Sequence, residues 1–465
     1  MDTIWGSTAL SNALVAAGRA KYLGLAQFIR QSIGPNLAPA DRLPPVRDLA
    51  FQIGVTPGTV ARAYGVLIDE GLLEAGVGRG TFVARGRRAT VMPNPGPDVD
   101  GMLDLLSPKL PECGQADLLR GALAAAARHV ADADMLRYPS RATDLAARIA
   151  FAEMIQAAPV GPFSAEDVVV SHGGQAAIML ILQTILRGDA PVVLVDELCY
   201  GGFRRASEML RARVVGVPWD AQGPVPEALE KLAKAHQAQV FLTSSEVSNP
   251  MGRGVSLVRR QAVADIAAEL GLNIVDDDCY RNGPFAGPSY RALLPDLGWY
   301  VTSPSKSLTA ALRIGFVIPP VQHSADLARN AVSASFGVSR FLTDAFVHLA
   351  QHPDREDVSI QIRAGVNALI AVMRDHLGQF ALTTRPDLPF GWLDLPAGWR
   401  AGAFVDAARA VGVLIRSADD FALRDGRAVQ AVRIAINGQT GPERFGAGLA
   451  ALARLLRQPP QDISV

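Results

Sequence analysis

The chain has 465 residues, of which 49% are hydrophobic and 19% charged, and its formal net charge is zero. This composition is typical of a globular protein and excludes a chain dominated by a basic or acidic tail, while the length predicts two or three domains. The three cysteines lack the number and spacing of a disulfide framework or a zinc site. The amino terminus lacks the pattern of a signal peptide and no apolar run is long enough to cross a membrane, so we expect a cytoplasmic protein without a membrane partner.

The amino-terminal part of the chain predicts a small, mildly basic module. Residues 1–88 carry ten Lys and Arg against six Asp and Glu. Apolar residues at helical spacing predict three helices, over residues 22–33, 45–54 and 56–70. The tight turn between the last two makes a helix-turn-helix, and the glycine-rich residues 72–83 predict a two-stranded wing.

Two motifs of this module are specific: Leu43-Pro44-Pro45-Val46-Arg47-Asp48-Leu49-Ala50 and Gly78-Arg79-Gly80-Thr81-Phe82-Val83. With them, residues 1–84 resemble the winged helix-turn-helix of the GntR family, which implies binding to double-stranded DNA. The DNA contacts that the resemblance implies are Arg47, Thr56, Thr59, Arg62 and Arg79. A helical protein-interaction module remains the alternative, because the excess of basic residues is small.

Residues 85–104 contain three closely spaced prolines and no apolar periodicity, which predicts a linker. Its Arg85, Arg87 and Arg88 could follow a phosphate backbone or be solvated.

Beyond residue 105 the pattern changes to apolar strands that alternate with helical stretches. The predicted strands are residues 168–171, 192–196, 213–217, 240–243, 273–277, 300–303 and 314–318. Such alternation predicts a mostly parallel sheet covered on both faces, with ligands beyond the carboxyl ends of the strands.

Polar residues gather where these strands end. Gly173 and Gly174 follow the first strand and enter a helix, an arrangement that holds an anion or simply makes a tight turn. Asp276, Asp277 and Asp278 lie at the end of the fifth strand, and acids at such a place need a cationic partner. A pyridinium nitrogen and Mg²⁺ both qualify, but no nucleotide-type phosphate loop accompanies the aspartates, so we expect no metal site.

The stretch Ser-Pro-Ser-Lys-Ser-Leu-Thr-Ala-Ala-Leu-Arg-Ile-Gly, residues 303–315, carries the strongest chemical signal. Lys306 follows an apolar strand and lies between hydroxyl residues, with Arg313 seven positions on. An amine in such a place can form a Schiff base with an aldehyde, while hydroxyls and a guanidinium can hold a phosphate. An exposed loop lysine is the alternative for this stretch taken alone.

Taken in order, these segments resemble the fold-type I aminotransferases, which use pyridoxal 5′-phosphate, over residues 105–465. The resemblance implies a large subdomain over about 105–320, a small one over about 321–465, a Schiff base at Lys306, and pairing of Asp277 with the ring nitrogen. The remaining cofactor contacts that it implies are Gly174, Gln175, Tyr200, Asn249, Tyr280, Ser303, Ser305 and Arg313.

Two further residues follow from the same resemblance. Arg433, in Val432-Arg433-Ile434-Ala435-Ile436, matches the arginine that grips the α-carboxylate of an amino acid. Tyr138 matches the tyrosine that reaches the phosphate of a partner subunit, which implies a homodimer.

A GntR-type reader joined to an aminotransferase-like domain resembles the MocR subfamily of transcriptional regulators. The implied function is regulation in which an amine or amino acid forms an external aldimine with the cofactor and thereby changes DNA binding. A working aminotransferase with an accessory amino-terminal module is the alternative, and a pyridoxal phosphate sensor that needs no amine is a third possibility.

Overall fold

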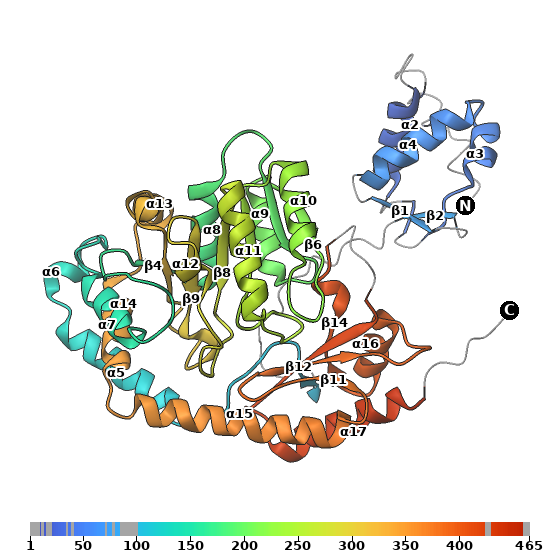
Figure 1. Ribbon diagram of the computed structural model, residues 1–465. Helices are drawn as coiled ribbons and strands as arrows, with labels where there is room; N and C mark the ends of the chain where they lie inside the picture. Colours follow the sequence, from blue (N-terminus) through green and yellow to red (C-terminus); the bar gives the residue numbers. More distant parts are fainter. Residues whose placement is uncertain are drawn as a thin grey trace. The chain divides into compact units, whose positions relative to one another are not determined.

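The computed structural model describes residues 10, 14, 21–33, 36–38, 41–69, 72–76, 80–83, 101–423 and 429–458. The chain divides into two compact units, Met1–Asn94 and Pro95–Val465 (Figure 1). Most of the predicted linker lies outside the described residues. Leu103 and Asp104, which the sequence pattern assigned to that linker, instead form strand β3 (Leu103–Asp104), which pairs in parallel with β13 (Val413–Leu414) of the second unit.

The first unit contains three helices and a hairpin: α2 (Lys21–Ser32), α3 (Val46–Gln52), α4 (Pro57–Asp69), β1 (Leu73–Gly76) and β2 (Gly80–Val83). The two strands are antiparallel, as expected of a wing. Apolar residues at helical spacing, among them Leu25, Leu49 and Leu67, meet in one core. The hydroxyl of Tyr64 donates to the carbonyl of Pro44 at 2.9 Å and so ties α4 to the segment before α3.

A seven-stranded sheet organises the second unit. Its order is β4 (Val169–Ser171), β10 (Gly315–Ile318), β9 (Gly298–Thr302), β8 (Asn273–Asp277), β7 (Val240–Thr243), β5 (Val192–Asp196) and β6 (Arg213–Val217). All strands are parallel except β10, which runs antiparallel to both of its neighbours. Each strand lies within two residues of its predicted bounds, because apolar runs between turn residues define buried strands well.

Helices cover both faces of this sheet (Figure 1). One apolar core joins the sheet to α8 (Gly174–Ile185), α9 (Gly201–Met209) and α13 (Ser324–Ser335). On the other face the covering helices are α10 (Pro226–His236), α11 (Leu257–Leu270), α12 (Tyr290–Leu293), α5 (Gln115–His129), α7 (Leu145–Met154) and α14 (Arg340–Ala350). Helix α6 (Asp132–Met135) lies between α5 and α7 in the sequence.

A smaller four-stranded sheet follows, in the order β11 (Ala381–Thr383), β12 (Phe390–Asp394), β15 (Ala431–Ala435) and β14 (Arg416–Ser417). The long helix α15 (Arg355–Leu377), α16 (Ala401–Ala410) and α17 (Pro442–Leu456) pack with it. The predicted boundary at residue 321 differs from this arrangement. Because α13 and α14 pack on helices of the large sheet, the small subdomain begins with α15.

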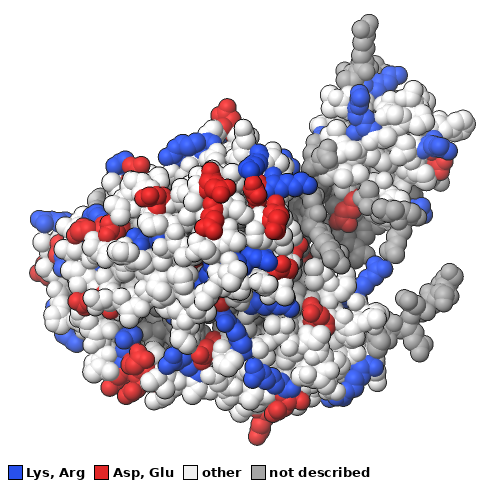
Figure 2. Space-filling view, in the orientation of Figure 1, with Lys and Arg blue, Asp and Glu red and all other residues white. Residues whose placement is uncertain are grey.

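The charge distribution agrees with the composition. On the face of the second unit that Figure 2 shows, acidic and basic side chains are interspersed rather than gathered into a field of one sign. Within the described parts of the chain, no helix combines the length and apolar character that crossing a membrane requires.

Candidate functional site

The lysine turn after β9 is fixed by serine hydroxyls. Buried Ser303 donates its hydroxyl to the carbonyl of Ile314 at 3.0 Å, and its oxygen accepts from the backbone N–H of Ser305 at 3.2 Å. These bonds hold the short helix Pro304–Lys306 against β10. The Nζ atom of Lys306 lies 5.7 Å from the centroid of the Tyr280 ring. Among the described residues, the Lys306 amine has no hydrogen bond or ion pair, so it is available to a ligand.

An anion cradle opens beside this lysine, at the amino terminus of α8. Gly173 has a φ of 85°, and a Cβ atom there would lie 2.8 Å from Nη2 of Arg313. A Cβ atom on Gly174 would lie 2.7 Å from Sγ of Cys279. Glycine is therefore favoured at both positions, and the guanidinium of Arg313 lies beside Gly173 at the start of α8. A helix amino terminus with an adjacent arginine is suited to a phosphate group.

Asp277 lies at the end of β8 without a cationic partner among the described residues. Its Oδ1 accepts from the backbone N–H of Cys279 at 3.0 Å, and burial raises the pKa of its carboxyl. Tyr200 lies close by, and burial raises the pKa of its phenol too. The side-chain amide of Gln175 donates to the carbonyl of Gly202 at 3.1 Å, while its buried Oε1 has no partner among the described atoms. The region around residues 277–280, Lys306, Arg433 and the start of α8 is called the crevice below. Near Asp277 it lacks a cation, and near Gln175 it lacks a hydrogen-bond donor, among the described residues.

The three aspartates point to different partners, which argues against the magnesium alternative. Asp276 accepts hydrogen bonds from the backbone and hydroxyl of Ser245, whereas Asp278 accepts from the hydroxyl of Tyr300 at 2.5 Å and pairs with Arg281 at 2.7 Å. Among the described side chains, no group of three His, Cys, Asp or Glu is arranged to hold a metal ion.

Arg433 on β15 is a buried guanidinium without a carboxylate partner among the described residues. Its Nη1 donates to Oδ1 of Asn249 at 2.6 Å and its Nη2 donates to the carbonyl of Leu106 at 2.7 Å. The Nε atom is buried and has no hydrogen bond there. The ring centroids of Phe390 and Phe421 lie 5.3 and 4.8 Å from Cζ of Arg433. Burial lowers the pKa of the Arg433 guanidinium. A ligand carboxylate would supply the missing countercharge.

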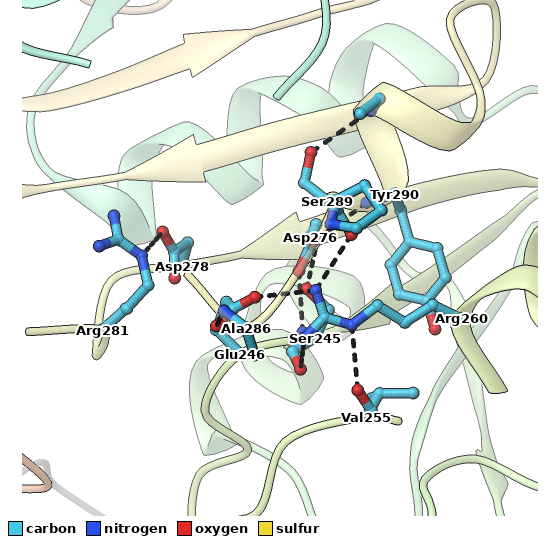
Figure 3. Close-up of polar contacts among 12 residues, drawn as sticks. Ser245, Glu246, Val255, Arg260, Asp276, Asp278, Arg281, Ala286, Ser289 and Tyr290 are labelled. Atoms are coloured by element: carbon cyan, nitrogen blue, oxygen red, sulfur yellow. Dashed lines mark hydrogen bonds and ion pairs between the residues drawn. The ribbon is translucent and has the colours of Figure 1, made fainter. Parts of the chain in front are cut away.

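A second buried cluster positions the loops that carry these side chains (Figure 3). Arg260 on α11 pairs with Glu246 at 2.8 Å and also donates to the carbonyls of Ser245 and Val255. Glu246 in turn accepts from the backbone N–H of Ala286 at 3.0 Å. Sequence reasoning missed this pair. The signal for Glu246 was present, since an acid three residues after an apolar strand needs a partner, but nothing in the sequence identified Arg260 as that partner.

The remaining predicted residues lie elsewhere. The side chain of Tyr138 is 76% exposed and stacks on Phe336, with ring centroids 4.7 Å apart, so it stands outside the crevice of its own chain. In the first unit, the exposed Arg47 lies on α3, and Arg62 lies on α4 over the ring of Tyr22 at 5.3 Å.

The start of α4 carries the two predicted threonines. The Oγ1 of Thr56 accepts from the backbone N–H of Thr59 at 3.3 Å and caps the helix. Arg79 lies outside the described residues.

Comparison with known proteins identifies the two units of the chain. The family description "Aminotransferase class I and II" matches residues 102–440, and "Bacterial regulatory proteins, gntR family" matches residues 21–83. The chain belongs to the class I and II aminotransferase family. Its first unit is a GntR-type helix-turn-helix, so the predicted fold class and domain combination are confirmed.

Among related proteins, several are named as regulators. The uncharacterized HTH-type transcriptional regulator YdeF of Bacillus subtilis is 25% identical over 94% of each chain. The pyridoxine biosynthesis transcriptional regulator PdxR of Corynebacterium glutamicum is 28% identical over 65% of this chain and 67% of its own length. The probable rhizopine catabolism regulatory protein MocR of Rhizobium meliloti is 27% identical over 60% of this chain and 61% of its own.

Solved structures show the same fold for the second unit. The α-aminoadipate aminotransferase LysN of Thermus thermophilus matches with a TM-score of 0.67 and 24% identity, over 77% of this chain and 92% of that one. A multiple substrate aminotransferase of Thermococcus profundus matches with a TM-score of 0.69 and 20% identity, over 78% of this chain and 93% of that one.

Proposed function

We propose that the protein is a cytoplasmic, DNA-binding transcriptional regulator of the MocR type that senses an amine or amino acid through pyridoxal 5′-phosphate held at Lys306. Regulators such as YdeF share both units with this chain, which supports the regulatory part. The cofactor part is supported by charged and polar groups of the crevice that lack partners among the described residues. The observation that carries the proposal is that one crevice contains an amine, an anion cradle, a carboxyl without a cation and an arginine without a carboxylate.

Each of these features fits a part of pyridoxal phosphate. The N–H groups of Gly174 and Gln175, the hydroxyls of Ser303 and Ser305, and Arg313 would hold the phosphate. The carboxyl of Asp277 would accept a proton shared with the ring nitrogen, and a pyridinium there would reverse the rise in pKa that burial imposes on this acid.

Three further side chains would orient the ring. Tyr200 would stack on it, while Asn249 and Tyr280 would hydrogen-bond its phenolic oxygen. Because Asn249 also accepts from Nη1 of Arg433, a ligand at that arginine would contact the same hydrogen-bond network.

The bound cofactor would supply an aldehyde that exchanges one amine partner for another. The protein would select the ligand: Arg433 would bind a carboxylate, with Phe390 and Phe421 excluding water from the pair. A ligand of this kind can change DNA binding only by preferring one arrangement of the protein. Tyr138, exposed in one chain, would complete the phosphate cup of a partner subunit in a homodimer.

The DNA part rests on the first unit. Helix α4, which Thr56 caps, presents Thr59 and Arg62 near its amino terminus, where a recognition helix contacts DNA. Arg47 and Arg79 would hold phosphates. Pro57 and Gly58 occupy the first turn and offer no polar side chain, so we expect phosphate contacts to supply most of the affinity.

The test is DNA binding by the full chain to its own upstream DNA, titrated with amino acids and amines. We expect the affinity to change with one class of amine in the wild type and not in Lys306→Ala. Equal responses of the two proteins would contradict the proposal.

An aminotransferase is the second candidate, because the residues that would hold the cofactor in a sensor would also hold it in a transaminase. The 2-aminoadipate transaminase of Thermus thermophilus is 26% identical over 51% of this chain and 62% of its own length. Rapid transamination together with no binding to upstream DNA would favour this function over regulation.

A further inference from the structure

A second cavity of about 350 Å³ lies behind the lysine turn, and the proposed function makes no use of it. Its walls come from α7, α14, the first nine residues of α15, residues 281–284 and the segment 302–308. Lys306, Asp277 and Arg433 are not among its lining residues. The cavity therefore shares the lysine turn, including Ser303, with the crevice, but not these three side chains.

The lining of the cavity combines apolar and polar side chains. The apolar ones are Phe151, Met154, Ile155, Leu308, Phe346 and Leu349. The polar and charged ones, called the polar side below, include Arg281, Asn282, Arg355, Glu356, Ser359 and Arg363. A cavity of this size, with a few polar groups among apolar side chains, is typical of a small-molecule site.

The charges on the polar side add up to one unpaired cation. Arg281 pairs with Asp278 at 2.7 Å and stacks on Phe285, while Arg355 pairs with Glu356 at 3.6 Å (the first of these pairs is drawn in Figure 3). Half-buried Arg363 has neither an ion pair nor a hydrogen bond among the described residues. A guanidinium held at an apolar cavity without a partner favours a bound anion.

From these features we infer a binding site for a small monocarboxylic acid with an aromatic or branched apolar body, whose carboxylate pairs with Arg363. The apolar body lies against Phe151, Phe346 and Leu349, and one charge on the ligand matches the one unpaired charge on the wall.

A ligand bound in this cavity would contact the lysine turn directly. Ser303 and Pro304 line the cavity, and Ser303 also makes the hydrogen bonds that fix the turn on its other side. A bound acid therefore restricts the turn that carries Lys306, and this second part of the inference rests on the proposed function.

The binding part is tested by calorimetry on the full chain with 4-hydroxyphenylacetate, which has no amine and cannot react with an aldehyde. We expect binding that the neutral analogue 2-(4-hydroxyphenyl)ethanol lacks, and a loss of about tenfold or more in Arg363→Gln. The variant Arg363→Lys should keep part of the affinity. Arg374→Gln, which changes an exposed arginine on the same helix, should bind as the wild type does.

Three results would overturn the binding part: no binding to the wild type, equal affinity in Arg363→Gln, or loss of binding in Arg433→Met, which would place the acid in the crevice. Retained binding in Arg433→Met supports the cavity.

The coupling part has a separate readout. In protein loaded with pyridoxal phosphate, we expect the acid to shift the visible absorption band in the wild type but not in Arg363→Gln. Binding without any shift would overturn the coupling alone. If the protein acquires no visible band, the cofactor proposal fails while the calorimetric result still decides the cavity.

Discussion

Two buried arginines lie near the carboxyl edge of the large sheet, and their surroundings differ in one respect. Arg260 has a carboxylate partner in Glu246 and donates to three backbone carbonyls. Arg433 has an amide and one carbonyl, a buried Nε atom without a hydrogen bond, and no carboxylate partner among the described residues. Both side chains are almost fully buried, with exposed fractions of 0% and 3%.

The difference separates a structural role from a binding role. A buried charge whose donors are used within the fold stabilises a loop arrangement, whereas one that lacks its countercharge is costly unless a ligand supplies it. By this criterion Arg260 stabilises the loops that carry Asn249 and Tyr280, whereas Arg433 is available to bind the carboxylate of a ligand. The predictions below test that division.

The largest effect is expected for Arg260→Met. Removing this guanidinium leaves the carboxylate of Glu246 buried without a cation, so the free energy of unfolding should fall by about 3–5 kcal/mol. Urea unfolding can be followed by tryptophan fluorescence, since Trp219, Trp299, Trp392 and Trp399 all lie in the second unit. The matched variant Arg433→Met orphans two neutral acceptors but also removes a buried charge that lacks its countercharge, so the loss should be smaller, at most about 1–3 kcal/mol. Equal losses in the two variants would remove the distinction between them.

Ligand binding should be affected more by Arg433→Met than by Arg260→Met, the reverse of the order expected for stability. Arg433→Met should weaken binding of an amino-acid effector by about 1.5–3 kcal/mol, the range for hydrogen bonds to charged groups. It should leave unchanged the binding of the corresponding amine without a carboxylate. Calorimetry with both ligands on both proteins isolates the carboxylate contact, and a similar loss for both ligands would show that the effect is not specific to it.

Stability should fall as the pH rises from about 4 to about 7. Burial raises the pKa of Asp196 from 3.8 to about 7, so the folded state binds this proton more tightly than the unfolded state does. The stabilisation is complete below pH 4 and is lost as the pH passes through 7, at no more than about 1.4 kcal/mol per pH unit.

Asp196→Asn keeps an acceptor for the indole N–H of Trp219 and should flatten the slope. Unfolding curves at several pH values measure it. An unchanged slope would mean that Asp196 does not titrate in this range.

The smallest effect concerns the first unit. Thr56→Ala removes the hydroxyl that caps α4 and should lower the stability of this unit by about 1 kcal/mol. Thr56→Ser keeps the cap and serves as the control in thermal unfolding. A loss in the serine variant as large as that in the alanine variant would assign the effect to the lost methyl group.

Much of this architecture was predictable from local sequence. Strands such as Val192–Asp196 are apolar runs bounded by turn residues, and the same regularity placed the ends of α2 and α4 to within a residue or two. The residues at strand ends, including Asp277 and Lys306, were predictable because parallel strands bring their carboxyl ends to one edge.

Long-range relations were not predictable in the same way. The pairing of Arg260 with Glu246 joins residues 14 positions apart through tertiary packing, and the parallel pairing of Leu103 with Val413 extends the folded unit into the predicted linker. The docking of α13 on the large sheet moved the subdomain boundary, since an amphipathic helix does not reveal which sheet it covers.

The central claim is that Lys306 is the amine that holds the cofactor, and one measurement tests it most directly. The protein, loaded with pyridoxal 5′-phosphate, is reduced with borohydride, digested and analysed by peptide mass spectrometry. We predict a pyridoxyl phosphate group on the peptide that contains Lys306. An unmodified Lys306, with the label absent or on Lys21, Lys109, Lys231 or Lys234, would contradict the account.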